Sequence, residues 1–228
     1  MTRLNSEQFI RANTCQGTAP LVPEIVLYLA TEITPIWQAT EDWLRERALQ
    51  PPYWAFAWPG GQALARHMLD NPCLVAGKRV LDFAAGCGIA AIACAQAGAS
   101  SVEAAEIDDI ARAAIRLNAA ANRVGVAVAE GDVVGDACRW DIILCGDVCY
   151  EVPMTTRILP WLRLIAETAE VWIADPGRAY LPGSGLSPIT QYIVPTALEL
   201  EDRTERRVGL YRLMPVAADN DARSTPGH

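Results

Sequence analysis

The sequence predicts an α/β fold with a mostly parallel sheet, helices on both faces and an antiparallel hairpin at one edge. From residue 78 onward, short apolar runs alternate with longer runs of helical periodicity, as in a parallel sheet with crossover helices. Near the end of the chain, two alternating apolar runs flank a charged turn, which is typical of a hairpin. The length of 228 residues suits one such domain.

Each element has its own signal. Apolar and β-branched runs predict strands over 79–83, 102–107, 127–130, 141–145 and 171–174. Apolar residues at helical spacing predict helices over 89–97, 109–123 and 155–169, the last of which contains Pro160. The edge hairpin is predicted over 196–201 and 208–214, with a solvated turn at 202–207.

The first eighty residues lack this alternation. A short helix is predicted over 6–13, with Ser6 as its N-cap. Residues 25–33 form either a helix or a strand, and the pattern does not decide between them. Residues 51–61 are dense in aromatics and end in Pro-Gly-Gly, so we expect a defined loop, followed by a helix over 62–70.

Composition excludes several classes of function. The net charge of −8 and the sequence pI of about 4.8 disfavour nucleic acid as a partner. We find no apolar run long enough to span a membrane and no signal-peptide core, which predicts a cytoplasmic protein. The sequence predicts no disulfide framework, because its seven cysteines include no C-x-x-C pair. It also predicts no metal site, because the two histidines lie far apart. Lys78 is the only lysine.

The strongest local signal is a glycine-rich turn between the first parallel strand and its helix. Gly86 and Gly88 would let the backbone approach a ligand closely, at the strand end where α/β sheets bind ligands. Glu106, at the end of the next strand, is placed to bond ribose hydroxyls, and Asp132, after the third, to accept from an adenine amine. The alternative is that these glycines only make tight turns.

Two cofactors match this turn in part. Residues 86–91 fit the dinucleotide fingerprint G-x-G-x-x-A. Asp82 would repel a pyrophosphate, however, and would suit the cationic amino group of a methionine moiety. Too little chain follows for a separate substrate domain of a nicotinamide-dependent oxidoreductase. The pattern D-x-x-x-G-x-G, with the two later carboxylates, resembles class I S-adenosylmethionine-dependent methyltransferases, which implies S-adenosylmethionine as cofactor and S-adenosylhomocysteine as product.

The loop after the fourth strand bears on the methyl acceptor. It carries neither the Asn-Pro-Pro-Tyr of amide and adenine methyltransferases nor the Pro-Cys of cytosine methyltransferases. Its D-x-x-Y, from Asp147 to Tyr150, resembles the seven-strand protein-lysine methyltransferases. We expect Asp147 to hold the lysine amine as an orienting group and Tyr150 to position it. The alternative role for Asp147 is to cap the following helix.

Further motifs sharpen the resemblance. Trp58-Pro-Gly-Gly-Gln62 and Ala174-Asp-Pro-Gly-Arg178, with the two motifs above, make residues 23–214 similar to the electron transfer flavoprotein β-subunit lysine methyltransferase family. This resemblance implies a Rossmann-like class I methyltransferase fold with a seven-stranded sheet. It also implies methylation of a lysine on the flavoprotein's β subunit. Glu106 departs from the more usual Asp but keeps the carboxylate.

The remaining expectations concern the other site residues and the organisation of the chain. The expected cofactor-binding residues are Trp58, Gly60, Gln62, Asp82, Gly86, Gly88, Glu106, Asp132 and Gly146. The expected substrate-binding residues are Tyr53, Trp54, Asp175 and Arg178. We expect a recognition or lid segment at 1–75, a cofactor-binding methyltransferase domain at 76–215 and a flexible tail at 216–228, together forming one globular unit and a monomer.

Alternatives remain open at this point. Tyr53 and Trp54 would equally well pack the N-terminal segment, and Arg178 would equally well pair with Asp175 to stiffen the turn. The chain could also be a small-molecule N-methyltransferase of the nicotinamide type, or an inactive module that binds S-adenosylmethionine.

Overall fold

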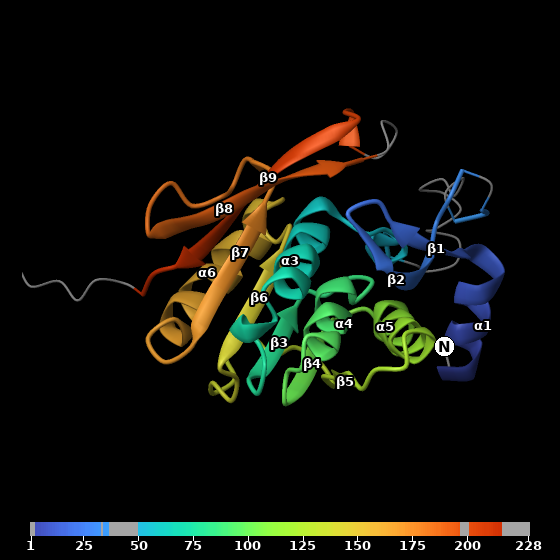
Figure 1. Cartoon of the computed structure of the whole chain (residues 1–228), viewed down its shortest axis with the longest axis horizontal. Coiled ribbons are helices and arrows are strands. Elements are labelled where there is room, and N and C mark those ends of the chain that lie inside the picture. The colour runs from blue at the N-terminus through green and yellow to red at the C-terminus, as the bar shows by residue number, and fades with distance from the viewer. Residues whose placement is uncertain (1–2, 33, 37–49, 197–200, 216–228) are drawn as a thin grey trace, which may run out of the picture.

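The computed structural model describes residues 3–32, 34–36, 50–196 and 201–215 (Figure 1). The predicted tail at 216–228 lies outside them. Seven described strands form one sheet in the order β5-β4-β3-β6-β7-β9-β8. They are β3 (Arg79–Phe83), β4 (Ser101–Ala105), β5 (Ala127–Val128), β6 (Ile142–Gly146), β7 (Glu170–Asp175), β8 (Leu186–Pro195) and β9 (Glu205–Leu213). Only β9 runs antiparallel to its two neighbours, so the predicted fold class is confirmed.

Helices cover both faces of this sheet (Figure 1). They are α3 (Pro59–Asp70), α4 (Ile89–Gln96), α5 (Asp109–Ala121) and α6 (Val152–Ile165). Alternate residues of each strand point to opposite faces. Val80, Ile142 and Leu144 therefore pack with α3 and α4, whereas Leu81 and Ile143 pack with α6 on the other side. The core thus consists of two apolar layers separated by the sheet.

The N-terminal elements pack beside α5. They are α1 (Arg3–Asn13), β1 (Cys15–Ala19), β2 (Val22–Leu29) and the 3₁₀ turn η1 (Tyr53–Ala55), with a second turn, η2 (Pro72–Leu74), after α3. The undecided segment 25–33 contributes to β2, which pairs antiparallel with β1. The side chain of Asn118 in α5 accepts from the backbone N–H of Tyr28 at 2.8 Å, and that of Asn122 accepts from Val26 at 2.9 Å.

The edge hairpin differs from the prediction. Its second strand, β9, lies near the predicted range, but its first strand is Leu186–Pro195 rather than 196–201. Residues 197–200 lie outside the described part of the chain. Two prolines, Pro188 and Pro195, conceal the true strand in the sequence, and they are tolerated because β8 is an edge strand with one unpaired side.

Helix boundaries shift for similar reasons. The helix predicted over 62–70 begins at Pro59, because proline fits the first helical position. The helix predicted over 155–169 spans Val152–Ile165 and includes Pro160. Among the described residues, the structure contains no helix that is long and apolar enough to cross a membrane.

Candidate functional site

A pocket opens at the carboxyl ends of β3 and β6, next to the glycine-rich turn. Its lining includes Trp58, Asp82, Gly86, Gly146 and Asp147. Gly86 and Gly88 have φ angles of +54° and +78°, which L side chains rarely adopt. A Cβ on Gly86 would have no atom closer than 3.9 Å, so this glycine faces open space. The turn is therefore a backbone cradle that needs glycine at both positions and is open toward a ligand at Gly86.

Asp82 is a buried carboxylate on the wall of this pocket. It is 3% exposed, and its Oδ2 accepts a hydrogen bond from the backbone N–H of Ala91 at 2.9 Å. Burial raises the pKa of Asp82 to about 8, even though this hydrogen bond opposes the shift. A cationic group bound in the pocket would stabilise the ionised carboxylate. The pocket therefore fits the cationic amino acid moiety of S-adenosylmethionine.

Glu106 lies against the glycine turn from the end of β4. Its Oε1 accepts from the backbone N–H of Gly86 at 2.7 Å. Burial raises the pKa of Glu106, and the hydrogen bond from Gly86 opposes that shift. The structure therefore brings this carboxylate and the glycine turn together, as the motif spacing predicts.

Asp132 lies farther from the pocket, and its carboxylate has other partners. Its Oδ1 accepts from the backbone N–H of Val134 at 3.0 Å, and its Oδ2 pairs with Arg157 of α6. Partial burial is the largest single influence on the pKa of Asp132 and raises it, but the hydrogen bonds from Arg157 and Val134 and the charge of Arg157 together outweigh burial, so the net shift is downward. Asp132 does not line the pocket, and its predicted role toward adenine stays a prediction.

Asp147 is the most constrained residue of the site. It follows β6 with a φ of +56°, and its backbone N–H donates to the carbonyl of Ala174 at 3.0 Å. Its Oδ2 accepts from the backbone N–H of Gly60 at 2.5 Å, and its Oδ1 accepts from Nη2 of Arg178 at 2.9 Å. Asp147 thus binds the N-terminal turn of α3. It does not cap the helix that follows it, because Glu151 holds the N-cap of α6.

Burial dominates the electrostatics of Asp147. The side chain is largely removed from water, and this raises its pKa to about 6. The charge and hydrogen bond of Arg178 lower the pKa, the N–H of Gly60 lowers it further, and Asp175 raises it. Hydrogen bonds from Gly60 and from the guanidinium group of Arg178 favour the ionised form of Asp147, which places a buried negative charge at the pocket.

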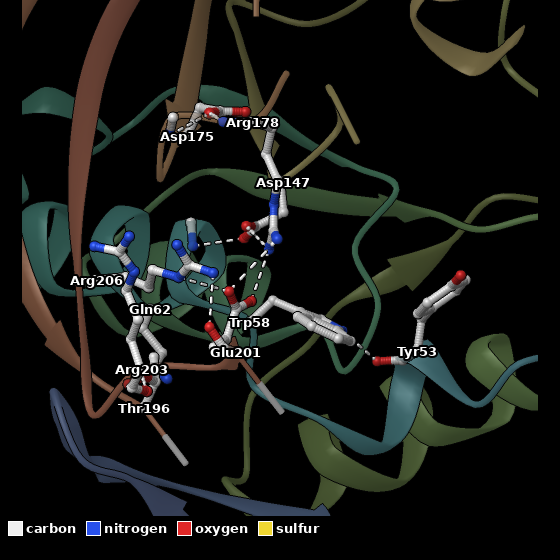
Figure 2. Close-up of polar contacts among 12 residues, drawn as sticks. Tyr53, Trp58, Gln62, Asp147, Asp175, Arg178, Thr196, Glu201, Arg203 and Arg206 are labelled. Atoms are coloured by element: carbon white, nitrogen blue, oxygen red, sulfur yellow. Dashed lines mark hydrogen bonds and ion pairs between the residues drawn. The ribbon is translucent and has the colours of Figure 1, made fainter. Parts of the chain in front are cut away.

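A chain of ion pairs connects Asp147 through Arg178 to Glu201 and Arg206 (Figure 2). Nη2 of Arg178 also donates to Oε1 of Glu201 at 2.7 Å, and Nε of Arg206 donates to Oε2 of Glu201 at 2.9 Å. Asp175 contributes differently, because its Oδ1 accepts from the backbone N–H groups of Gly177 and Arg178 at 2.7 and 2.6 Å. Oδ2 of Asp175 is buried without a hydrogen-bond partner. The Arg178 side chain therefore pairs with Asp147 and Glu201, and the predicted pairing with Asp175 occurs through its backbone.

Exposed aromatic rings surround the mouth of the pocket. The Tyr53 ring lies 5.7 Å from that of Tyr150 and 5.9 Å from that of Trp58, between centroids. Nε1 of Trp58 donates to the carbonyl of Tyr53 at 2.8 Å, which fixes the indole. Tyr53 and Tyr150 are 49% and 40% exposed, so their faces are available to a ligand. Burial raises the pKa of Tyr150 to about 12, so the phenol stays neutral.

Two predicted binding residues have structural roles instead. Trp54 is 2% exposed and packs in the core with Phe9 and residues of α5, so it cannot line a substrate channel. Gln62 is 3% exposed; its amide nitrogen donates to the carbonyl of Ala57 at 2.7 Å and its oxygen accepts from the N–H of Leu21 at 3.3 Å. Neither side chain has a free face for a ligand.

Gly60 and Gly146 allow close packing between α3 and β6. A Cβ on Gly60 would lie 2.5 Å from Oδ2 of Asp147, and one on Gly146 would lie 2.8 Å from the backbone nitrogen of Gly61. Both positions therefore require glycine so that the start of α3 can reach Asp147. They shape the pocket by bringing backbones together, a role that the motif alone does not specify.

Sequence analysis missed Glu201 and Arg206. Glu201 has a side chain only 1% exposed, although the charged turn beside it was expected to be solvated. The signal in the sequence was the group of three arginines within six residues after Glu201. A buried glutamate requires cationic partners of this kind. The sequence did not show that this turn lies near the pocket, because that depends on where the two hairpin strands begin and end.

Comparisons with known proteins agree with this geometry. The family model described as ribosomal protein L11 methyltransferase (PrmA) matches residues 63–148. The electron transfer flavoprotein beta subunit lysine methyltransferase of Xenopus laevis is 40% identical over 209 residues, covering 89% of this chain and 82% of that protein. The human protein of the same name is 36% identical over 208 residues, covering 89% and 78%.

A solved structure supports the fold. The magnesium protoporphyrin IX methyltransferase from Synechocystis PCC 6803 with bound SAM superposes with a TM-score of 0.52 at 19% identity. The alignment covers 68% of this chain and 80% of that one. At this identity, the likeness shows a shared class I methyltransferase fold.

Proposed function

Since the chain belongs to the electron transfer flavoprotein β-subunit lysine methyltransferase family and is a methyltransferase, we propose that it methylates lysines of an electron transfer flavoprotein β subunit. The observation that carries this proposal is the position of Asp147. Its buried carboxylate lines the same pocket as the glycine turn, so the amine acceptor and the methyl donor would meet there.

S-adenosylmethionine is the methyl donor in this proposal. Its methionine moiety would lie by Asp82 and the glycine turn, its ribose by Glu106, and its adenine on the side of Asp132. When bound, this cofactor supplies a methyl group attached to a positively charged sulfur. The raised pKa of Asp82 supports the first of these placements, because a buried carboxylate favours a cationic neighbour.

The acceptor side would bind the lysine. A free lysine has a pKa of about 10.4, so the ammonium must be bound and must lose its proton before its nitrogen can accept a methyl group. A carboxylate raises the pKa of a nearby amine, so Asp147 orients the amine rather than removing its proton. Most of the rate enhancement then comes from alignment. Tyr53, Trp58 and Tyr150 would line the approach, where aromatic faces tolerate methylated, cationic nitrogen.

A transfer assay tests the proposal. The purified protein is incubated with labelled S-adenosylmethionine and an electron transfer flavoprotein, and labelled peptides are identified by mass spectrometry. We expect label on β-subunit lysines, lost in Asp147→Asn. Asp141→Asn is the matched control, because Asp141 pairs with Arg79 at the opposite ends of the strands. Label on nicotinamide and not on protein would contradict the proposal.

That the protein is cytoplasmic and monomeric stays a prediction from the sequence. The small-molecule alternative is not favoured, because the relatives are named for a protein substrate.

A further inference from the structure

We propose that Glu201 is a positioning residue for methyl transfer, acting through Arg178. By binding the guanidinium group of Arg178, Glu201 leaves the negative charge of Asp147 available to the substrate amine. This inference rests on the proposed function and extends it to a residue that none of the sequence motifs contains.

The geometry favours Glu201 as the main partner of Arg178. Nη2 of Arg178 donates to Oε1 of Glu201 at 2.7 Å, and Nη1 lies 3.5 Å from Oε2. Asp147 receives a single hydrogen bond from the same Nη2, at 2.9 Å. The guanidinium group is thus shared between two carboxylates, and it makes two contacts with Glu201 but one with Asp147 (Figure 2).

Glu201 is itself held rigidly. Its side chain is 1% exposed, and Arg206 binds both its carboxylate, at 2.9 Å, and its backbone carbonyl, at 2.7 Å. Arg206 belongs to β9, the strand that pairs antiparallel with β7. The edge hairpin therefore reaches the pocket through this contact.

Charge balance gives the contact its function. Glu201 offsets part of the charge of Arg178, so Asp147 does not have to neutralise that guanidinium group alone. The other groups that act on Asp147 are the N–H of Gly60 and the carboxylate of Asp175. With a neutral side chain at position 201, an unbalanced positive charge would remain beside Asp147. That charge would repel a lysine ammonium, and charge interactions at this depth are weakly screened.

A purely structural role makes different predictions. If Glu201 only fastens the hairpin to the sheet, then loss of Glu201 or of Arg206 would lower activity in the same way. If Glu201 acts through charge, the two losses have opposite effects on substrate affinity. Removal of Arg206 takes away a positive charge, and the carboxylate of Glu201 then pairs with Arg178 alone.

The first test therefore compares Glu201→Gln with Arg206→Gln. For Glu201→Gln we expect KM for the protein substrate to rise about 10-fold, with kcat and the affinity for S-adenosylhomocysteine nearly unchanged. For Arg206→Gln we expect KM to fall. Glu201→Asp, which keeps the charge, should restore most of the affinity. A rise of KM in both glutamine variants, or no change in Glu201→Gln, would overturn the proposal.

A double-mutant cycle tests whether Glu201 acts through Arg178. In an Arg178→Gln background, Glu201→Gln should change KM by less than about twofold, because the charge that it balanced is gone. An equally large rise of KM in both backgrounds would show that Glu201 acts by another route and would contradict the proposal.

A titration separates this inference from the choice of substrate. In protein with ¹³C-labelled aspartate, the Asp147 carboxyl is assigned by its loss in Asp147→Asn. We expect Asp147 to titrate at lower pH in Glu201→Gln than in the wild type, since Arg178 then acts on it alone. An unchanged titration would refute the role of Glu201. An inactive wild type with the expected titration would refute only the proposed substrate.

Discussion

The two halves of the pocket are built in different ways. The glycine-turn half (Asp82, Gly86, Gly88 and Glu106) uses short connections, because each carboxylate accepts a backbone N–H no more than 20 residues away. The amine half (Gly60, Asp147, Arg178 and Glu201) joins residues separated by 87, 31 and 23 positions. The glycine-turn half is held by backbone donors and the amine half largely by arginines.

This difference explains what each half can do. Backbone donors hold the two carboxyl groups of the glycine-turn half at a fixed place, and a cationic ligand would stabilise the ionised form of Asp82. In the amine half, Asp147 already pairs with a cation of the protein, Arg178. The positive charge of Arg178 must therefore be balanced by a second carboxylate, Glu201, before a substrate cation can bind at Asp147. Variants in the two halves should therefore separate cofactor affinity from methyl transfer.

The largest effect is expected at Asp147. Asp147→Asn keeps the shape and tolerates the positive φ, but it removes the charge that faces the amine. We expect kcat/KM to fall by about 30-fold or more, because the loss of one buried charged partner costs about 2–5 kcal/mol. The affinity for S-adenosylhomocysteine, measured by calorimetry, should change little. An active variant, or one that fails to fold, would favour a purely structural role for Asp147.

Next in size is Gly60→Ala, compared with Gly61→Ala. A Cβ at position 60 would lie 2.6 Å from the carbonyl oxygen of Ala174, which is backbone and cannot move away. A Cβ at position 61 meets only Cγ2 of Ile89, at 3.2 Å. We expect Gly60→Ala to lower the free energy of unfolding by about 1–3 kcal/mol and to displace Asp147. Chemical denaturation that finds equal losses in the two variants would refute this packing account.

Asp82 should give a pH-dependent effect on the cofactor alone. Its pKa is about 8 in the free protein, so a cationic ligand that needs the ionised form must displace a proton below that pH. We expect the affinity for S-adenosylhomocysteine to rise between pH 6 and 8 in the wild type. In Asp82→Asn we expect it to be about 10-fold weaker at pH 8 and independent of pH.

The same carboxyl should affect stability. Because its pKa is raised on folding, the stability associated with its protonated form is present at low pH and is lost as the pH rises toward 8. Thermal unfolding should therefore show that the melting temperature of Asp82→Asn rises relative to that of the wild type as the pH increases from 4 to 8. Asp141→Asn is the control, because its pKa is lowered to about 2 and it titrates below this window. The same trend in both variants would exclude Asp82 as its source.

The smallest effect is expected at Asp132. It is exposed, and its carboxylate is already shared between Arg157 and the N–H of Val134. A hydrogen bond to an adenine amine at such a position contributes about 1 kcal/mol, so Asp132→Ala, which removes the acceptor, should weaken cofactor binding about fivefold and leave kcat unchanged. Calorimetry that detects no change would remove Asp132 from the site.

The sequence predicted the fold and the glycine-turn half more fully than the amine half. The parallel strands and the D-x-x-x-G-x-G turn are local patterns, so spacing alone placed Asp82, Gly86 and Glu106 at neighbouring strand ends. The first hairpin strand was misplaced because prolines interrupt it, which only an edge position permits.

The amine half depends on contacts that no local pattern records. Nothing near Gln62 in the sequence indicates that its amide binds the carbonyl of Ala57 and the N–H of Leu21. Trp54 was ambiguous because an aromatic next to a motif packs in a core as readily as it lines a channel. The burial of Glu201 follows from how the hairpin crosses the sheet end, which is a property of the whole fold.

The long spans of the amine half also set an order of events during synthesis. The glycine turn and both of its carboxylates are complete once residue 106 has left the ribosome, whereas Arg178 has no buried counter-charge until Glu201 has emerged. Domains generally fold as units during synthesis, and the edge hairpin is the last part of this one to be made. A chain that ends before Glu201 would therefore leave Arg178 without its buried counter-charge, so the acceptor side depends on the part of the domain that is made last.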